Sequence, residues 1–403
     1  MKAKKIHIPL SEPDINDDDI NRVVAVLKSG WITTGPVVRE FETLLAAWLG
    51  VPYVLCLNSA TAGMELILRA FGIGDGDEVI TTVYTYAATA NVIRHTGARA
   101  VLVDTNADDF SIDPSAVAAA MSPRTKAIIP VDFGGAPCDY AKLHAITESA
   151  RKDFRPANSR QEQFGRPIIL SDAAHSLGSR YKGERVSPLV DFAVYSLHAV
   201  KNLTTAEGGI IAFRGTSDAF AVDFARSLRL LALHGQTKDA LAKLNAGNWE
   251  YEIELCGYKH NMTDMQAALG IGQLARYEAS LARRKEISEM YCRGLQDERF
   301  MHPAWVHNAE AQCESSYHLY PLRIRRYGVN ERNALITRLA ECGIAANVHY
   351  KPLPLFSAYA DYAMKDYPKA YAHYEHEITL PLWAKMSDAQ ASEVIDAIQS
   401  HSL

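Results

Sequence analysis

The sequence predicts a protein of the α/β class, with a mostly parallel sheet of seven strands and a second, smaller domain. Short, almost continuous apolar runs alternate with helical patterns through the first 255 residues, as strands do when a parallel sheet is covered on both faces. At 403 residues the chain is also too long for one small core. We therefore expect a large α/β domain over 1–255 and a smaller α+β domain over 256–403.

The chain is expected to begin with a helical arm. Segment 11–30 places acids in a first turn, then apolar residues at helical spacing, and ends at Gly30; segment 35–50 repeats the pattern and ends at Gly50. Between the later strands, the polar segment 148–166 predicts a helix end followed by an exposed loop. The seven expected strands are Tyr53–Leu57, a run that starts near Glu78, 99–104, 125–133, 167–173, 191–196 and 208–213.

The pattern changes after about residue 255. One long amphipathic helix or two helices are expected over 263–295, followed by a strand at 317–324. A helix over 331–342 and a final helix over 387–399 complete the smaller domain.

The composition is that of a globular protein that stays in the cytoplasm. The net charge of -5 gives no general attraction to nucleic acid or to an anionic membrane surface. The six cysteines lie far apart without a C-x-x-C pair, which argues against a zinc ribbon and favours reduced thiols. The N-terminus lacks the apolar stretch of a signal peptide, and no run reaches the ~20 apolar residues of a membrane helix.

Polar residues at strand ends are the candidates for chemistry, because ligands bind at the carboxyl edge of parallel sheets. The turn Asn58–Gly63 offers small residues and hydroxyls where a helix begins, which suits either a phosphate cradle or an ordinary helix cap. Tyr84 and Tyr86 follow the next strand, where core packing is the simpler interpretation.

An acid and a lysine follow two later strands. Asp172 ends one apolar run, with His175 three residues on, and Ser196 and Lys201 end another. A buried acid at this position needs a positive partner, and a desolvated lysine loses its proton more easily than an exposed one. These are the parts that a pyridoxal phosphate site requires: a lysine for the Schiff base and an acid for the pyridine nitrogen.

The amino-acid sequences of several segments resemble those of one enzyme family. In order, "GWITTGPVVREFE", "NSATAGMELILRAFGIGDGDEVIT", "SDAAHSLGSRYKGE", "SLHAVKNLTTAEGG", "GYKHNMTDMQAALGIGQL", "YHLYPLRI", "NVHYKPL" and "ITLPLW" resemble the DegT/StrS family of sugar-nucleotide aminotransferases. The resemblance covers almost the whole chain, and "NSATAGM" and "DAAH" are most similar to enzymes that aminate UDP-linked 4-keto-sugars, such as the 4-amino-arabinose type. It implies a fold-type I pyridoxal phosphate enzyme, active as a homodimer in which each site is completed by the neighbouring subunit.

Carried over residue by residue, the resemblance makes Lys201 the Schiff-base lysine and the acid/base of the reaction. Asp172 would pair with the pyridine nitrogen, His175 would lie beside the phenolic oxygen, and Tyr86 would stack on the ring. The resemblance implies no metal ligand. The other matches are Ala60, Thr61 and Ser196 in the phosphate cradle, Thr34 in the N-terminal substrate loop, and His349 and Tyr350 approaching the sugar.

The chain departs from the family pattern at four places, one of which is the 148–166 loop, longer than in typical members. "GYKHNM" replaces the usual "GYNYRM", so that Lys259 and Asn261 stand in a loop that reaches the other subunit in the family; we expect them to hold cofactor phosphate or nucleotide there. "VDFGGAP" replaces "VHLYGQP", which removes a histidine near the sugar, and Leu197 replaces a usual Phe. These changes bear on the sugar rather than on the cofactor.

The leading hypothesis is a ping-pong transaminase in amino-sugar, polysaccharide or glycoconjugate biosynthesis. L-glutamate, or alternatively glutamine, would convert the cofactor to pyridoxamine phosphate, which would then aminate a nucleotide-linked keto-sugar, with C4 favoured over C3. A pyridoxal phosphate-dependent sugar dehydratase or lyase is the first alternative; dehydrating relatives carry His in place of Lys201, although a lyase that keeps the lysine stays open. The second is a non-enzymatic regulator, for which the chain offers neither a basic face nor a helix-turn-helix.

Overall fold

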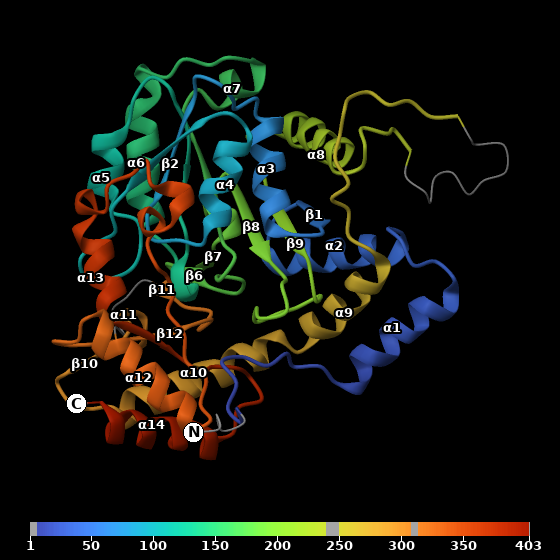
Figure 1. Ribbon diagram of the computed structural model, residues 1–403. Coiled ribbons are helices and arrows are strands. Elements are labelled where there is room, and N and C mark those ends of the chain that lie inside the picture. The colour runs from blue at the N-terminus through green and yellow to red at the C-terminus, as the bar shows by residue number, and fades with distance from the viewer. Residues whose placement is uncertain (1–5, 239–249, 308–312, 403) are drawn as a thin grey trace.

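A sheet of seven strands forms the centre of the computed structural model, which describes residues 6–238, 250–307 and 313–402 (Figure 1). Its strand order is β1–β9–β8–β5–β4–β2–β3, and all neighbours run parallel except β9, which is antiparallel to β1 and β8. The predicted mostly parallel, seven-stranded sheet is therefore confirmed. The strands are β1 (Tyr53–Leu57), β2 (Glu78–Thr82), β3 (Arg99–Val103), β4 (Thr125–Ile129), β5 (Ile168–Asp172), β8 (Phe192–Ser196) and β9 (Gly209–Phe213).

Helices cover both faces of this sheet. Successive residues of a strand point to opposite sides, so the apolar residues of each strand contribute to a core on each face. In β5, Ile168 and Leu170 join the core beneath α3, α4 and α8, whereas Ile169 joins the core on the other face. The helices of the first face are α3 (Ala60–Ala70), α4 (Ala87–His95) and α8 (Asp218–Ala232); those of the second are α2 (Pro36–Leu49), α5 (Pro114–Ala120), α6 (Tyr140–Ser149) and α9 (Asp264–Ala275).

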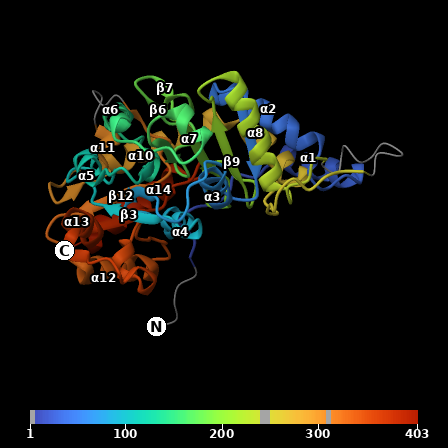
Figure 2. The same cartoon turned by 90° about the horizontal axis from the view of Figure 1, so that it is seen from above.

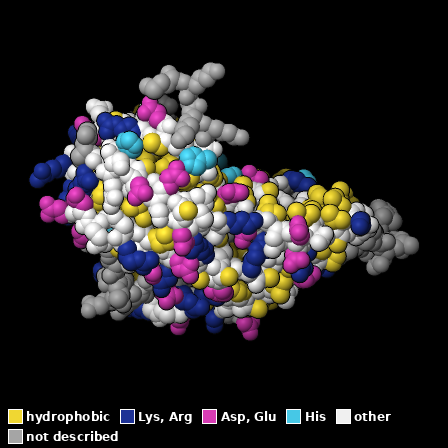
Figure 3. Space-filling model, turned by 90° about the horizontal axis from the view of Figure 1, so that it is seen from below, with side chains coloured by type: hydrophobic (Ala, Val, Ile, Leu, Met, Phe, Trp, Pro, Cys, Tyr) yellow, Lys and Arg dark blue, Asp and Glu magenta, His cyan; other side chains and the backbone are white. Residues whose placement is uncertain are grey.

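The helical arm is confirmed with its predicted stops. Helix α1 (Asp17–Ser29) begins at an Asn16 capping box and ends at Gly30, whose φ is 75°. Helix α2 ends at Gly50, with φ 74°; in both cases the left-handed residue is the one type that adopts this conformation at little cost. Three exposed apolar side chains remain on α1 and the segment after it: Ile20, Leu27 and Ile32. Figure 3 shows apolar side chains gathered at one end of the molecule.

The prediction of an exposed loop over 148–166 was wrong in part. A short helix, α7 (Ser159–Phe164), lies inside this segment and buries the aromatic ring of Phe164 in the core. Gln161 is fully buried and donates to the carbonyl of Phe71 at 3.1 Å. The high polarity of the segment hid these anchors, which tie it to the end of α3.

The C-terminal part is a separate α+β layer, at the bottom of Figure 1 and at one end of the view from above (Figure 2). Its antiparallel sheet, in the order β10–β12–β13, packs against the long helix α10, and the predicted 263–295 region is two helices that meet at Arg276. Ile8, near the N-terminus, pairs with Ile344 and joins the same core. The domain boundary near residue 255 stays a prediction. The elements are α10 (Tyr277–Gly294), β10 (Phe300–Met301), β12 (Tyr320–Ile324), α12 (Val329–Glu341), α13 (Pro368–His376), β13 (Glu377–Leu380) and α14 (Asp388–His401).

A small antiparallel sheet joins the two parts, because β11 (Cys313–Glu314) of the C-terminal part pairs with β6 (Arg180–Tyr181), which pairs with β7 (Glu184–Arg185). The short helix α11 (Ala304–His307) precedes β11 along the chain. Among the helices of the described ranges, none combines the length and the apolar character that crossing a bilayer requires.

Candidate active site

Three strands bring their ends together at one edge of the central sheet. β5 ends at Asp172, which lies in register with Val194 of β8, and β8 ends two residues later at Ser196. Ser196 and Leu57, the last residue of β1, both pair with Gly209 at the start of β9. The turn after β1 therefore lies near Ser196, at the edge where ligands bind in α/β sheets.

Lys201 lies in the turn that follows β8. Its backbone N–H donates to the carbonyl of His198 at 2.9 Å, which fixes the turn. Burial lowers the pKa of the Lys201 amine to about 8, against the opposing effect of the Asp172 carboxylate. An amine with this pKa is partly uncharged near neutral pH, so it can act as a nucleophile or a base.

Asp172 is a buried carboxylate that forms no ion pair with another residue in the described part of the chain. The Thr89 hydroxyl donates to its Oδ2 at 2.7 Å, and the Ala174 N–H donates to its Oδ1 at 3.3 Å. Burial raises the pKa of the Asp172 carboxyl, and these hydrogen bonds, with the charge of Lys201, oppose the rise. The site thus suits a ligand that brings its own N–H cation to this carboxylate.

His175 is buried and hydrogen-bonded through both ring nitrogens. Its Nδ1 accepts from the backbone N–H of Gly134 at 3.2 Å, so the proton of the neutral ring belongs on Nε2, 3.0 Å from the hydroxyl of Tyr350. Burial, followed by the charge of Lys201, holds the pKa of His175 well below its usual range. A neutral His175 is therefore a hydrogen-bond donor at this edge.

The segment before α13 brings His349 and Tyr350 to the same place. Tyr84, fully buried, donates from its hydroxyl to the His349 carbonyl at 2.8 Å. Tyr86 is 67% exposed, and its ring centre lies 6.3 Å from that of Tyr350. The predicted core packing therefore applies to Tyr84 and not to Tyr86, whose exposed ring can stack on a flat ligand.

The turn after β1 leaves backbone donors for an anion. The Ser59 hydroxyl caps the N–H of Ala62, and the Ser59 carbonyl accepts from Gly63. Within the described ranges, the N–H groups at the start of α3 that remain for a ligand are therefore those of Ala60 and Thr61. A Cβ on Gly209 would lie 2.4 Å from the Ala60 nitrogen. Glycine is thus required at position 209 for the close approach of β9 to this turn.

Thr34, Lys259 and Asn261 form a second group beside the same turn. The Asn261 amide donates to the Thr34 hydroxyl at 2.6 Å, and the Lys259 ammonium donates to the Asn261 Oδ1 at 2.7 Å. Asn261 also bridges to Leu57 at the end of β1. This group contacts the β1 end of the site and not the Asp172–His175–Tyr350 cluster.

Several buried residues of the site escaped sequence reasoning. Thr89 orients Asp172, and the ring of His318 packs against that of His175 at a tilt of 45°, with ring centres 4.3 Å apart. Glu377 and Thr379 lie behind His349 on β13 and hydrogen-bond to it. Glu377 could have been predicted from the sequence, because an acid at the start of the apolar run "EITLPLW" is expected to be buried and to need a partner.

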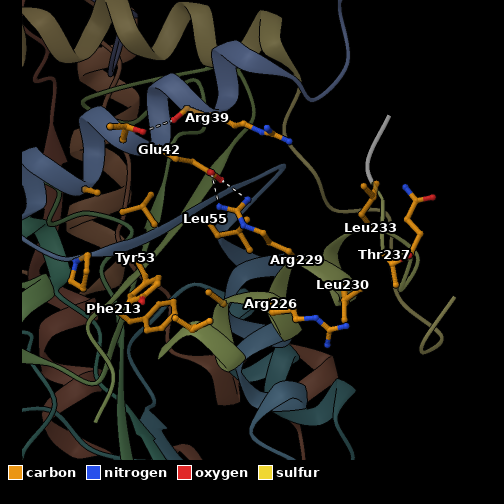
Figure 4. Close-up of a pocket in the computed structure, with 17 residues that line it drawn as sticks. Arg39, Glu42, Tyr53, Leu55, Phe213, Arg226, Arg229, Leu230, Leu233 and Thr237 are labelled. Atoms are coloured by element: carbon orange, nitrogen blue, oxygen red, sulfur yellow. Dashed lines mark hydrogen bonds and ion pairs between the residues drawn. The ribbon is translucent and has the colours of Figure 1, made fainter. Parts of the chain in front are cut away.

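A pocket of about 750 Å³ lies elsewhere, between α2, β1 and α8 (Figure 4). It is lined by Arg39, Arg226 and Arg229 together with apolar side chains of β1, and Arg229 forms an ion pair with Glu42 at 2.7 Å. None of the predicted site residues lines it, so we assign the chemistry to the strand ends instead.

Comparisons with known proteins identify the family of the chain. Residues 13–399 match the DegT/DnrJ/EryC1/StrS aminotransferase family. The spore coat polysaccharide biosynthesis protein SpsC of Bacillus subtilis is 37% identical, over 99% of this chain and 98% of its own length. The putative sugar aminotransferase Spr1654 of Streptococcus pneumoniae in its PMP form has 46% identity and a TM-score of 0.94, covering 98% of this chain and 99% of that one. Helicobacter pylori PseC, an aminotransferase involved in pseudoaminic acid biosynthesis, has 27% identity and a TM-score of 0.84, with 99% of each chain covered.

Proposed function

Because the chain belongs to the DegT/DnrJ/EryC1/StrS aminotransferase family, we propose that it transfers an amino group from L-glutamate to C4 of a nucleotide-linked keto-sugar. Membership makes it a sugar aminotransferase with pyridoxal phosphate as cofactor, like the solved relative known in PLP and PMP forms. The fold is accordingly fold-type I. The non-enzymatic alternative is wrong, and the donor, the nucleotide and the sugar carbon are the parts that need testing.

The names of relatives support the sugar chemistry. SpsC is named for spore coat polysaccharide biosynthesis, and PseC for the biosynthesis of pseudoaminic acid. We infer that this chain also aminates a sugar destined for a polysaccharide or glycoconjugate. The segments "NSATAGM" and "DAAH", which resemble UDP-4-keto-sugar enzymes, support C4 as the carbon and a nucleotide as the carrier.

One observation carries the proposal: the Lys201 amine, with its pKa lowered to about 8, shares the site with the buried carboxylate of Asp172, which forms no ion pair within the described residues. These residues fit pyridoxal phosphate. Asp172 would accept from the pyridine N–H, and Tyr86 would stack on the ring. The Ser196 hydroxyl and the free N–H groups of Ala60 and Thr61 would hold the phosphate, where dianions are bound by helix N-termini.

When bound, the cofactor supplies a carbonyl carbon that takes the amino group and a ring that withdraws electrons. The residues of the chain then orient the reactants and move protons. Lys201 would carry the proton between the substrate carbon and the cofactor carbon. Asp172, oriented by Thr89, would keep the ring nitrogen protonated, and His175, with its ring fixed by Gly134, would lie beside the ring oxygen.

We further propose that two copies of the chain share each site. The exposed apolar side chains on α1 and just after it, Ile20, Leu27 and Ile32, support a covered surface in this region. Thr34, Lys259 and Asn261 lie next to it and would contact cofactor phosphate or nucleotide across the interface. His349 and Tyr350 would approach the sugar from within the same chain.

The test uses purified protein loaded with pyridoxal phosphate. L-glutamate should convert the cofactor to pyridoxamine phosphate, with loss of the visible absorbance band, and Lys201→Ala should lack that response. A panel of UDP- and dTDP-linked 3-keto and 4-keto sugars, with products assigned by NMR, then identifies the sugar, nucleotide and carbon. Glutamine in place of glutamate tests the donor. A dehydrated product without nitrogen would overturn the proposal in favour of a lyase.

A further inference from the structure

A chain of hydrogen bonds runs from a buried carboxyl group to the imidazole of His349. Glu377 Oε2 accepts from the His349 backbone N–H at 3.0 Å, and Glu377 Oε1 is hydrogen-bonded to the Thr379 hydroxyl. The same hydroxyl lies 2.9 Å from the His349 Nδ1. Thr379 therefore connects the carboxyl group directly to one ring nitrogen.

The carboxyl group at the end of this chain lies in a dry environment. Glu377 and Thr379 are alternate residues of β13, so they share a face, and they are 0% and 1% exposed. The Arg332 guanidinium, from α12, donates to the Glu377 backbone carbonyl at 3.0 Å rather than to the carboxyl group. The other groups facing Glu377 are Tyr84, from the segment after β2, and the adjacent His349 and Tyr350.

The groups at the two ends of this hydrogen-bond chain, Glu377 and His349, both favour their neutral forms. Burial raises the pKa of Glu377 to about 8, while hydrogen bonds from Thr379 and His349, with the charge of Arg332, oppose the rise. Burial, followed by the charge of Lys201, lowers the pKa of His349 to about 4, so its ring carries a single proton near neutral pH. Because Nδ1 is bonded to Thr379, and no residue in the described ranges is hydrogen-bonded to Nε2, Nε2 is the nitrogen left for a ligand.

We propose that Glu377 and Thr379 form a proton relay that selects which nitrogen of His349 carries the ring proton, so that Nε2 switches between donor and acceptor. With neutral Glu377, the carboxyl donates to Thr379, Thr379 donates to Nδ1, and the ring proton lies on Nε2. With ionised Glu377, Thr379 donates to the carboxylate, Nδ1–H donates to Thr379, and Nε2 becomes an acceptor.

The part that the relay plays in catalysis rests on the proposed function. Amination replaces the keto oxygen of the sugar, which leaves as water after it takes up protons. His349 would give its Nε2 proton to that oxygen as the Thr379 proton moves to Nδ1 and the Glu377 proton moves to the Thr379 oxygen. Three bonds to hydrogen break and three form, and the negative charge ends on Glu377. The imidazole thus donates a proton without becoming an anion, and it need not be protonated to a cation beside Lys201 beforehand. His349 would contact the substrate, and Glu377 and Thr379 are positioning residues.

The first test is ¹⁵N NMR of the histidine rings in the full-length, ligand-free protein, with His349 assigned by comparison with His349→Asn. In the wild type, the proton should lie on Nε2 at low pH and on Nδ1 at high pH, with the change following Glu377. In Glu377→Gln the amide oxygen should accept from the His349 backbone N–H, as Oε2 does, which leaves the amide NH2 to donate to Thr379 as the neutral acid does. The ring proton should then stay on Nε2 between about pH 6 and about pH 10. A wild-type ring whose proton position does not change between about pH 6 and about pH 10 would overturn the relay.

The second test separates the two half-reactions. Thr379→Val should leave the glutamate half-reaction within about twofold and slow the sugar half-reaction at least about tenfold. Thr379→Ser, which keeps the hydroxyl, should restore it, and Thr81→Val is a control because Thr81 is also buried but donates to the Ile129 carbonyl, away from His349. Equal sugar rates in the valine and serine variants contradict the relay. A wild type that aminates no keto-sugar but shows the NMR change overturns the proposed function and leaves the relay in place.

Discussion

Replacing Gly209 by alanine perturbs the phosphate cradle without touching a side chain of the site. A Cβ there would lie 2.2 Å from the carbonyl carbon of Ser59 and 2.4 Å from the nitrogen of Ala60. Both are backbone atoms, which cannot rotate away, and ordinary contacts need about 3.5 Å. Strand β9 cannot yield easily, because Gly209 is held in register with Leu57 on one side and Ser196 on the other. The turn that starts α3 must therefore move by roughly 1 Å.

A shift of this size is enough to break hydrogen bonds to a phosphate. An N–H···O separation of about 2.9 Å would become about 3.9 Å, outside the range of a hydrogen bond. Hydrogen bonds to charged groups contribute about 1.5–3 kcal/mol each, so loss of even one weakens binding at least about tenfold. The crowding itself should cost about 1–3 kcal/mol of unfolding free energy.

The assay is a titration of ligand-free protein with pyridoxal phosphate and, separately, with pyridoxal, which lacks the phosphate. Gly209→Ala should weaken binding of the first compound at least about tenfold and change the second little. Gly74→Ala is the matched control, since the nearest atom to its new Cβ is the Thr96 carbonyl oxygen at an ordinary 3.4 Å. A Gly209→Ala protein that binds pyridoxal phosphate as the wild type does would refute this reasoning.

Further substitutions test the charges of the site. With a pKa of about 8 for Lys201, the rate at which ligand-free protein captures pyridoxal phosphate should rise with pH and level off above about pH 8; a midpoint near that of an exposed lysine contradicts the lowered pKa. Asp172→Asn should slow the glutamate half-reaction by roughly 10²–10³ in single-turnover absorbance measurements, and a change below about threefold would exclude the assigned role. The folded-state pKa of Glu377 is raised from 4.5 to about 8, so the stability that this group contributes is present at low pH and is lost as pH rises through about 8. In urea unfolding, Glu377→Gln should not show this loss of unfolding free energy. Parallel plots of unfolding free energy against pH for the two proteins would argue against the raised pKa. Mixing inactive Lys201→Ala with inactive Lys259→Ala subunits should restore activity if sites are shared, whereas no recovery means that each chain builds its own site.

The sheet and the chemistry at its edge could be predicted because both leave local signals in the sequence. β1 was predicted with its observed ends, and Asp172 and Ser196 fall at the ends of their strands as expected. A buried strand is a short apolar run, and the ligand edge follows from the direction of parallel strands.

Residues that act through another residue could not be predicted in this way. Thr89 lies inside α4 and looks like any helical threonine until the fold brings its hydroxyl 2.7 Å from Asp172. Glu377 and Thr379 meet His349 only because β13 pairs with the segment that contains Asn347. Tyr84 and Tyr86 are two residues apart, yet one is buried and the other, the N-cap residue of α4, is 67% exposed.

The position of β9 also has a consequence for the order in which the protein folds. The strand enters last along the chain and runs against its neighbours, yet it fills the gap between β1, formed near the beginning, and β8. Closing that gap requires contacts between segments far apart in sequence, which form slowly. Until Gly209 is in place, the turn at Ala60 and the hydroxyl of Ser196 belong to two unconnected pieces of sheet. A nascent chain therefore cannot hold the phosphate early, and cofactor capture marks the molecules whose central sheet is complete.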